Sequence, residues 1–157
     1  MLNLLFIPEI MLSFGVMVII LIDLFFQKNK GLSFTLVQFL LLIAAYYSLD
    51  NKLLPNYSAY TLNEFSNIFK FILLISSLIT FHYTYKHLKF LKILKIEYFT
   101  ISLLGLIGTM IMVSANSLLM LYLGIELLSL SLYALIGFNK KSSLSSEAAI
   151  KYYVLGA

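Results

Sequence analysis

The chain has 157 residues, of which 61% are hydrophobic and 11% are charged, and its mean hydropathy is +0.96. Soluble domains carry about 25% charged residues, so this composition excludes a soluble domain and predicts an integral membrane protein. The net charge of +4 arises from eleven lysines without arginine, a pattern that gives no support to nucleic-acid binding. Cysteine is absent, which excludes disulfides, zinc–thiolate sites and iron–sulfur ligation by this chain.

Five apolar segments are long enough to cross a bilayer, which takes about 17–25 residues. They cover about residues 9–26, 32–49, 66–83, 98–115 and 117–138. The first segment lacks the basic flank and cleavage site of a signal peptide, so we expect it to be retained as a span. The apolar runs show no period-two alternation, which excludes transmembrane strands. The predicted fold class is an all-α, polytopic transmembrane helix bundle with one membrane domain over residues 1–157.

Two stretches have further structural signatures. The fourth segment carries the small residues Gly105 and Gly108, which favour close approach of a neighbouring helix. Residues 85–96 mix lysines with leucine, isoleucine and phenylalanine. We expect this stretch to lie along the inner membrane surface with its lysine side chains extended toward water.

The lysines are distributed unequally between the two ends of the predicted spans. Eight lie on one side, and Lys52 and Lys70 lie on the other, with Lys70 at the mouth of the third span. By the positive-inside rule the N-terminus is outside and the lysine-rich loops are inside. The eight lysines are Lys28, Lys30, Lys86, Lys89, Lys92, Lys95, Lys140 and Lys141.

The last residues predict the start of a sixth helix over 146–157. Ser145 or Ser146 is a suitable cap for it. Eleven residues rise only about 16 Å, about half of a hydrocarbon core that is ~30 Å thick. A helix ending there would leave unpaired carbonyl groups in the bilayer. We therefore predict that a separate polypeptide completes this helix, or alternatively that the segment lies flat at the inner surface.

The main candidate for chemistry is Glu126, near the middle of the fifth segment. A carboxylate at that depth costs about 2.5–3.5 kcal/mol on insertion scales, and such groups commonly mark proton or ion paths. Tyr122, Ser129 and Tyr133 share its helix face at i−4, i+3 and i+7, where hydroxyl groups can support the carboxyl group or a water chain. The alternative is a Glu126 that is buried for packing and does not titrate.

Other charged residues have weaker claims to a proton role. Lys151 is four residues from Glu147, which favours a local ion pair over direct proton transfer. Glu9 and Asp23 are interpreted as membrane-edge anchors or loop contacts. The sequence has no phosphate-binding glycine loop, no nucleophile paired with a base and no metal cluster. We therefore expect no metal and no cofactor bound by this chain.

Three stretches resemble one known family. They are LFIPEIMLSFGVMVIILIDL near the start, MIMVSANSLLMLYLGIELLSLSLY around Glu126, and SSEAAIKYYVLGA at the end. In order and spacing they resemble subunit 2 of respiratory complex I, the antiporter-like subunit N of bacteria. The likeness is strong over the last third and fair over the first span, while the second and third spans agree only in topology.

The resemblance implies the N-terminal portion of an antiporter-like, proton-pumping membrane subunit. Glu126 matches the family's glutamate on the fifth span, whose lysine partner lies on a later span absent from this sequence. The chain would then be part of the enzyme NADH:ubiquinone oxidoreductase, with other complex I subunits, a separate chain carrying the rest of this subunit, and lipids as partners. NADH, FMN, iron–sulfur clusters and ubiquinone would be bound elsewhere in the complex.

Two other functions are open at this point: the N-terminal part of an Mrp-type cation/proton antiporter, and a purely structural membrane subunit. The composition, rich in Leu, Ile, Phe, Tyr, Lys and Asn without arginine, suggests an organellar gene. We expect a multi-pass protein of the mitochondrial inner membrane, with the N-terminus in the intermembrane space and the lysine-rich loops in the matrix.

Overall fold

A computed structural model describes residues 8–25, 30–49, 63–139 and 142–156, and over these ranges the chain is helical without strands. The helices are α1 (Pro8–Phe25), α2 (Lys30–Leu49), α3 (Glu64–Phe90), α4 (Ile96–Val113), α5 (Leu118–Ile136) and α6 (Ser143–Gly156). The first five are long and apolar enough to cross a membrane. The chain is a multi-pass membrane protein, and the predicted all-α fold class is confirmed.

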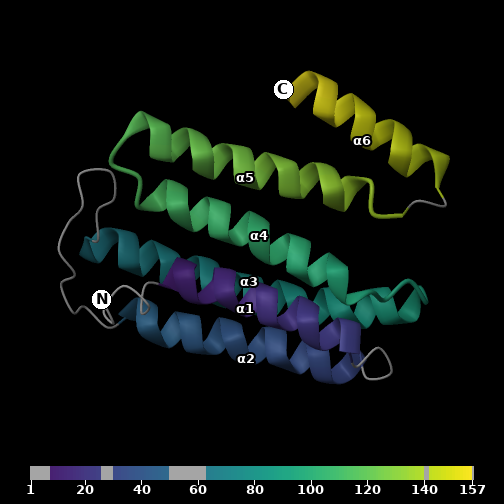
Figure 1. Ribbon diagram of the computed structural model, residues 1–157, viewed down its shortest axis with the longest axis horizontal. Coiled ribbons are helices and arrows are strands. Elements are labelled where there is room, and N and C mark those ends of the chain that lie inside the picture. The colour runs from purple at the N-terminus through teal and green to yellow at the C-terminus, as the bar shows by residue number, and fades with distance from the viewer. Residues whose placement is uncertain (1–7, 26–29, 50–62, 140–141, 157) are drawn as a thin grey trace.

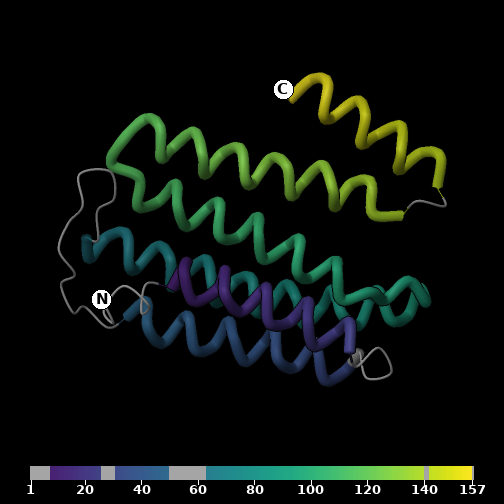
Figure 2. Tube along the Cα trace, viewed as in Figure 1, coloured from purple at the N-terminus to yellow at the C-terminus, as the bar shows by residue number. Residues whose placement is uncertain are grey.

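Successive helices run in opposite directions along the long axis of the molecule (Figures 1 and 2). Helices α1 to α4 form a closed four-helix bundle, in which α1 contacts α2 and α4, and α3 contacts the same two helices. Helix α5 packs on the outside of α4, and α6 packs on α5. Figure 1 accordingly shows α2 and α6 at opposite sides of the molecule.

Local sequence explains where several helices begin. Pro8 occupies the first turn of α1, where its fixed φ suits a helix and its missing N–H is no loss. At the start of α3, the Asn63 N–H donates to Ser66 Oγ at 3.1 Å, and the Ser66 hydroxyl donates to the Asn63 carbonyl at 2.8 Å. Ser117 caps α5 by accepting a hydrogen bond from the Met120 N–H at 3.2 Å.

The helix that contains the predicted third span, residues 66–83, is longer than that span, because α3 continues through Phe90. The stretch expected to lie along the membrane surface is therefore partly the last turns of α3. The helix ends in a turn in which the N–H groups of Lys92 and Ile93 donate back to the carbonyls of Lys89 and Leu88. This pattern is a Schellman motif, and Lys92 adopts the left-handed φ of 58° that the motif requires.

The sixth helix begins at Ser143, three residues earlier than predicted. Neither Ser145 nor Ser146 is its cap. The Ser142 hydroxyl oxygen accepts from the Ser145 N–H at 3.3 Å, and the Ser145 hydroxyl instead donates to the Ile136 carbonyl at the end of α5. Helix α6 then runs back alongside α5 (Figure 1). Ala157, the residue at which we predicted a second polypeptide to join, lies outside the described residues.

Glycine permits a close contact between the backbones of α4 and α5. A Cβ atom built on Gly108 would lie 2.8 Å from the Gly124 carbonyl oxygen and 2.8 Å from the Leu128 nitrogen. A Cβ on Gly124 would lie 2.9 Å from the Gly108 carbonyl oxygen. Helices in a membrane gain little from hydrophobic burial and associate through close packing. The predicted role of the fourth segment's glycines in packing is confirmed.

Aromatic rings fill the end of the bundle at which α3 stops and α4 starts. Phe34 of α2 stacks on Tyr85 of α3 with ring centroids 4.0 Å apart, and Phe99 of α4 lies 5.1 Å from Phe34 and 5.6 Å from Phe81. Phe99 is fully buried. Aromatic side chains bury large areas at fixed geometry, so this cluster joins three helices at one point.

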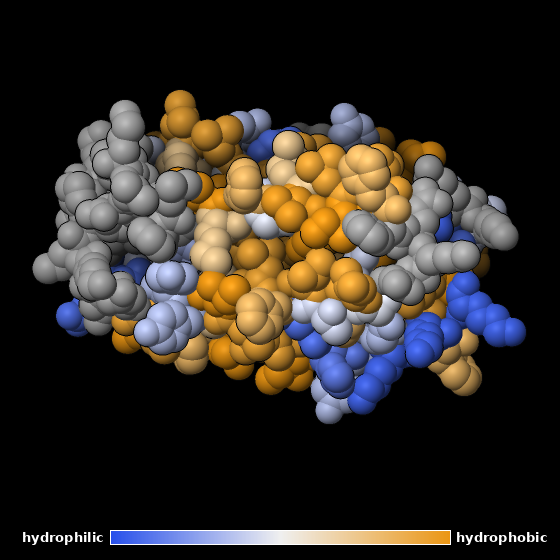
Figure 3. All heavy atoms as spheres, turned by 60° about the horizontal axis from the view of Figure 1, so that its bottom comes forward, coloured by the Kyte–Doolittle hydropathy of each residue, from blue (hydrophilic) through white to orange (hydrophobic). Residues whose placement is uncertain are grey.

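The surface of the molecule fits a lipid environment. In Figure 3 the middle of the visible face is mostly hydrophobic, and hydrophilic residues gather mainly toward the right-hand end. That is the end at which α3 stops and α4 starts (Figure 1), the site of Lys86, Lys89, Lys92 and Lys95. Four of the other lysines used to predict the orientation in the membrane lie outside the described residues: Lys28, Lys52, Lys140 and Lys141.

Candidate functional site

Glu126 lies eight residues after the start of α5 and ten before its end, about 12 Å and 15 Å along the axis at 1.5 Å per residue. It is therefore close to the middle of a candidate membrane span. Its side chain is exposed on the surface of this chain, as is that of Tyr122 one turn earlier. Among the residues of α5, all of which the structure describes, only Gly124 and Ser131 are buried. Glu126 thus faces away from the four-helix bundle.

The other predicted site residues do not form a hydrogen-bonded group with Glu126. The Ser129 hydroxyl donates to the Ile125 carbonyl of its own helix at 2.8 Å. Tyr133 packs edge-on against Tyr152 and Tyr153 of α6, with ring centroids 5.5 and 5.4 Å away. Within the described part of the chain, no hydrogen bond or ion pair reaches the Glu126 carboxylate, so any partner must come from outside these residues.

Lys151 makes the local ion pair expected from its spacing. Its Nζ lies 2.6 Å from Glu147 Oε1, and both side chains are exposed. Ion pairs of this kind at the surface contribute little to stability. The geometry gives Lys151 no contact with Glu126.

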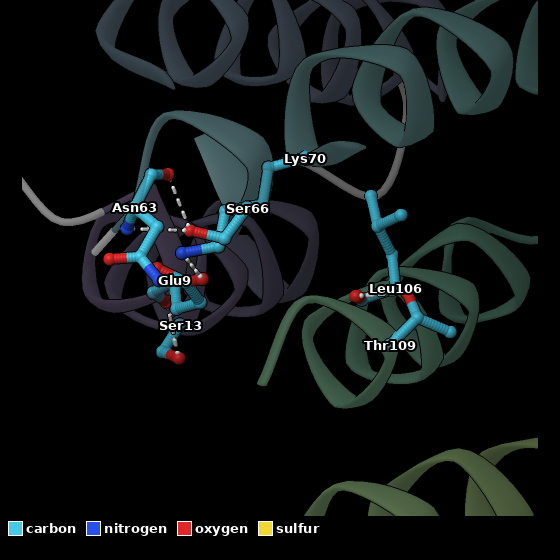
Figure 4. Close-up of polar contacts among 7 residues, drawn as sticks. All are labelled: Glu9, Ser13, Asn63, Ser66, Lys70, Leu106 and Thr109. Atoms are coloured by element: carbon cyan, nitrogen blue, oxygen red, sulfur yellow. Dashed lines mark hydrogen bonds and ion pairs between the residues drawn. The ribbon is translucent and has the colours of Figure 1, made fainter. Parts of the chain in front are cut away.

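A second pair of charged residues was not recognised in the sequence. Lys70 of α3 is fully buried, and its Nζ lies 2.7 Å from Oε1 of Glu9, at the start of α1, whose side chain is only 7% exposed. Figure 4 shows the two side chains meeting beside Ser66 and Ser13. Glu9 Oε2 is also buried, without a hydrogen-bond partner among the described residues.

This pair adds to two interpretations. Glu9, interpreted as a membrane-edge anchor or loop contact, makes a buried contact between α1 and α3, and Lys70, considered only for topology, is the other member of that ion pair. The overlooked signal was that Lys70 lies well inside an apolar helix, where an unpaired ammonium is costly. Asp23, the other residue assigned to the membrane edge, accepts a hydrogen bond from the Ser33 hydroxyl at 3.1 Å and so ties α1 to α2.

The described residues contain no group of three or more His, Cys, Asp or Glu side chains placed to hold a metal ion. The polar side chains of this part of the chain are carboxylates, lysines, histidines, amides and hydroxyls, some of them paired. The charge of a carboxyl group in a membrane depends on the partner that faces it.

Comparisons with known proteins show what this chain is similar to. Residues 115–157, which include Glu126, match a family profile described as NADH:quinone oxidoreductase/Mrp antiporter, TM. The chain is 38% identical over 155 residues to NADH-quinone oxidoreductase subunit N of Ruthia magnifica and 39% identical over 158 residues to that of Thioalkalivibrio sulfidiphilus. Each match covers 96% of this chain. The expected resemblance to subunit N is confirmed.

The similarity to subunit N extends across the second and third spans, where only the topology had been matched. The chain spans about a third of these relatives, since each match covers 32% of the bacterial protein. A solved structure of respiratory complex I from Thermus thermophilus with bound aureothin matches 95% of this chain and 33% of the other, with a TM-score of 0.72 at 22% sequence identity. At that identity the match establishes the fold.

Proposed function

We propose that this chain is part of a membrane-arm subunit of a proton-pumping NADH:ubiquinone oxidoreductase, and that Glu126 is a protonatable group on its proton path. The observation that carries the proposal is the position of Glu126, a carboxylate at mid-span on a helix face that the described residues leave exposed. The similarity to subunit N names the kind of enzyme. Oxidation of NADH by FMN and iron–sulfur clusters, and reduction of ubiquinone, would take place in other subunits.

The uncovered face of α5 and α6 is where the rest of such a subunit would pack. Helix α6 has no buried residue, although the structure describes all of it, and α5 has two. A carboxylate cannot stably face lipid at this depth, so a covering segment must supply water or a cation to Glu126. The relatives are about three times as long as the matched region. Their remaining length would supply this segment.

The supporting residues have distinct proposed roles. Tyr122, exposed one turn from Glu126, would hold water beside the carboxyl group. Ser129 and Tyr133 would shape the same face, although the Ser129 hydroxyl is already used within α5. Lys151 would take part in proton transfer only if its ammonium group separated from the Glu147 carboxylate.

A test is the Glu126→Gln variant in the assembled complex, reconstituted into vesicles. Glutamine keeps the shape of the side chain but cannot carry a proton. We expect normal assembly and a loss of proton translocation on the order of 10²-fold, the lower range for a positioned acid–base group. Glu64→Gln is the matched control, because Glu64 is an exposed carboxylate at the start of α3. If the Glu126→Gln variant pumps normally, Glu126 is not on the proton path, and the purely structural role is the one that remains.

The second candidate is a cation/proton antiporter of the Mrp type, favoured by the wording of the matching profile. The two candidates differ in their partners. A tagged chain that belongs to complex I should co-purify with flavin and iron–sulfur subunits. Purification with cation-transporting subunits alone would favour the antiporter.

For localisation we propose the mitochondrial inner membrane, with the N-terminus in the intermembrane space and the lysine-rich end in the matrix. The relatives reported above are bacterial, and in a bacterium the corresponding sides would be the periplasm and the cytoplasm. Support comes from the lysines gathered where α3 ends and α4 begins. In sealed inner-membrane vesicles, an impermeant amine reagent should label Lys52 and Lys89 from opposite sides. Labelling of both from one side would refute this orientation.

A further inference from the structure

The Glu9–Lys70 pair lies at the end of the bundle where α1 and α3 begin, opposite the lysine-rich end. Lys70 is six residues into α3, about 9 Å along the axis. It is fully buried, and the Glu9 side chain is 7% exposed. Protein therefore separates a full pair of opposite charges from its surroundings.

Such a pair is an expensive way to join two helices. Removing two charges from water costs several kcal/mol for each ion, and apolar residues of similar size commonly do as well or better. Ionisable groups inside membrane proteins are by default candidates for proton relay. The buried Glu9 Oε2, which no described donor meets, adds to this argument. A proton or a water molecule is small enough to meet that oxygen and would remove the penalty of an unmatched acceptor.

Among the described residues, the other charged groups lie apart from the pair. Helices α1 and α3 supply its two members, and α2 and α4 complete the bundle around them. Glu64, at the start of α3, is exposed. The remaining charged residues at or within α1, α2 and α4 lie toward the opposite end of the bundle: Asp23, Lys30, Lys95 and Glu97. Within the described part of the chain, Glu9 is the charged group that contacts Lys70.

We propose that Glu9 and Lys70 form a second proton-exchange site of the subunit, at the end where α1 and α3 begin. This inference rests on the proposed function, whose orientation places that end outside. A proton reaching the Glu9 carboxylate forms an O–H bond and leaves the buried pair with a net charge of +1. The Lys70 ammonium then loses one proton to water at that end. Transfer of the carboxyl proton to the neutral amine restores the carboxylate and the ammonium, so one proton enters and one leaves.

The burial of the site couples proton uptake to proton release. A buried site tolerates an ion pair better than a single unpaired charge, so uptake by Glu9 favours release from Lys70. The reverse order would pass through a lone carboxylate, which is disfavoured for the same reason, so burial couples the two steps without setting which comes first. The geometry thus provides a site that passes protons singly and does not accumulate them.

The first test is the double variant Glu9→Gln with Lys70→Gln, in the assembled complex reconstituted into vesicles. It removes both charges together and leaves neither unpaired. We expect assembly and NADH oxidation to persist while protons moved per NADH fall, on the order of 10²-fold if the pair is an obligatory relay. Glu64→Gln is the control at the same end of α3 and should pump normally. A double variant that assembles and pumps normally overturns the inference and leaves the pair as a structural contact.

The second test uses a variant that keeps both charges. Glu9→Asp retains a carboxylate beside Lys70, so it should assemble even if the double variant does not. Infrared difference spectra recorded during turnover should contain a carboxyl C=O band from Glu9 that shifts in Glu9→Asp. Absence of such a band in the unaltered complex, or an unshifted band, overturns the inference. If Glu126→Gln blocks pumping while both tests here fail, the proposed function stands and this site does not.

Discussion

Replacement of Gly108 by alanine tests the contact that holds α5 on the bundle. The added Cβ would lie 2.8 Å from the Gly124 oxygen and 2.8 Å from the Leu128 nitrogen, closer than carbon packs against backbone atoms. Both neighbours belong to the backbone of α5, so the helices must separate. Overpacking of this kind costs about 1–3 kcal/mol, and the better helix propensity of alanine returns up to about 1 kcal/mol. We expect the free energy of unfolding to fall by about 1–2 kcal/mol.

Thermal unfolding of the detergent-solubilised protein measures this loss, with two further glycine variants as references. Gly105→Ala should have an intermediate effect, because its Cβ would lie 3.3 Å from the Ser131 Cβ. Gly31→Ala should be neutral or slightly stabilising, because its nearest neighbour would be the Tyr85 hydroxyl at 3.8 Å. The order of stability should be Gly31→Ala, then Gly105→Ala, then Gly108→Ala. Equal stability of Gly108→Ala and Gly31→Ala would refute the proposed close contact.

Two further predictions concern the ends of α3. Lys92→Gly should raise the free energy of unfolding by about 1 kcal/mol, because glycine adopts the left-handed conformation of Lys92 without the Cβ penalty. An unchanged unfolding midpoint would contradict this. Glu9→Gln alone should lower stability by about 3–5 kcal/mol, since it leaves the Lys70 ammonium buried and unpaired. Adding Lys70→Gln should recover most of that loss, and failure to do so would show that the charges are not the cause.

The sequence alone predicted the fold class and the approximate spans, because both follow from local composition. Hydrophobic length determines whether a segment can cross a bilayer, and backbone hydrogen bonds in lipid require helices. Gly108 and the small residues around it also predicted close helix packing, because only a residue without a side chain lets two helix backbones approach so closely. The Glu147–Lys151 contact also followed from spacing within one helix.

The end of α3 could not be predicted in this way. The apolar run weakens after Phe81, yet the helix continues to Phe90, because polar helix-forming residues extend a helix beyond the membrane edge as readily as apolar ones. Its stop depends on a left-handed backbone at Lys92, a conformation for which lysine carries no signature. Hydropathy locates the membrane part of a helix and leaves its full length open.

The partners of the charged residues were decided by tertiary structure. Glu126 was identified from its depth in an apolar segment, but only the fold shows that it faces away from the bundle. Glu9 and Lys70 are 61 positions apart in the sequence, and no spacing rule joins them. Their meeting depends on how α1 and α3 are placed within the four-helix bundle. Depth in a membrane is a property of one segment and can be predicted from its residues, whereas the group that a buried charge meets is a property of the packing between segments.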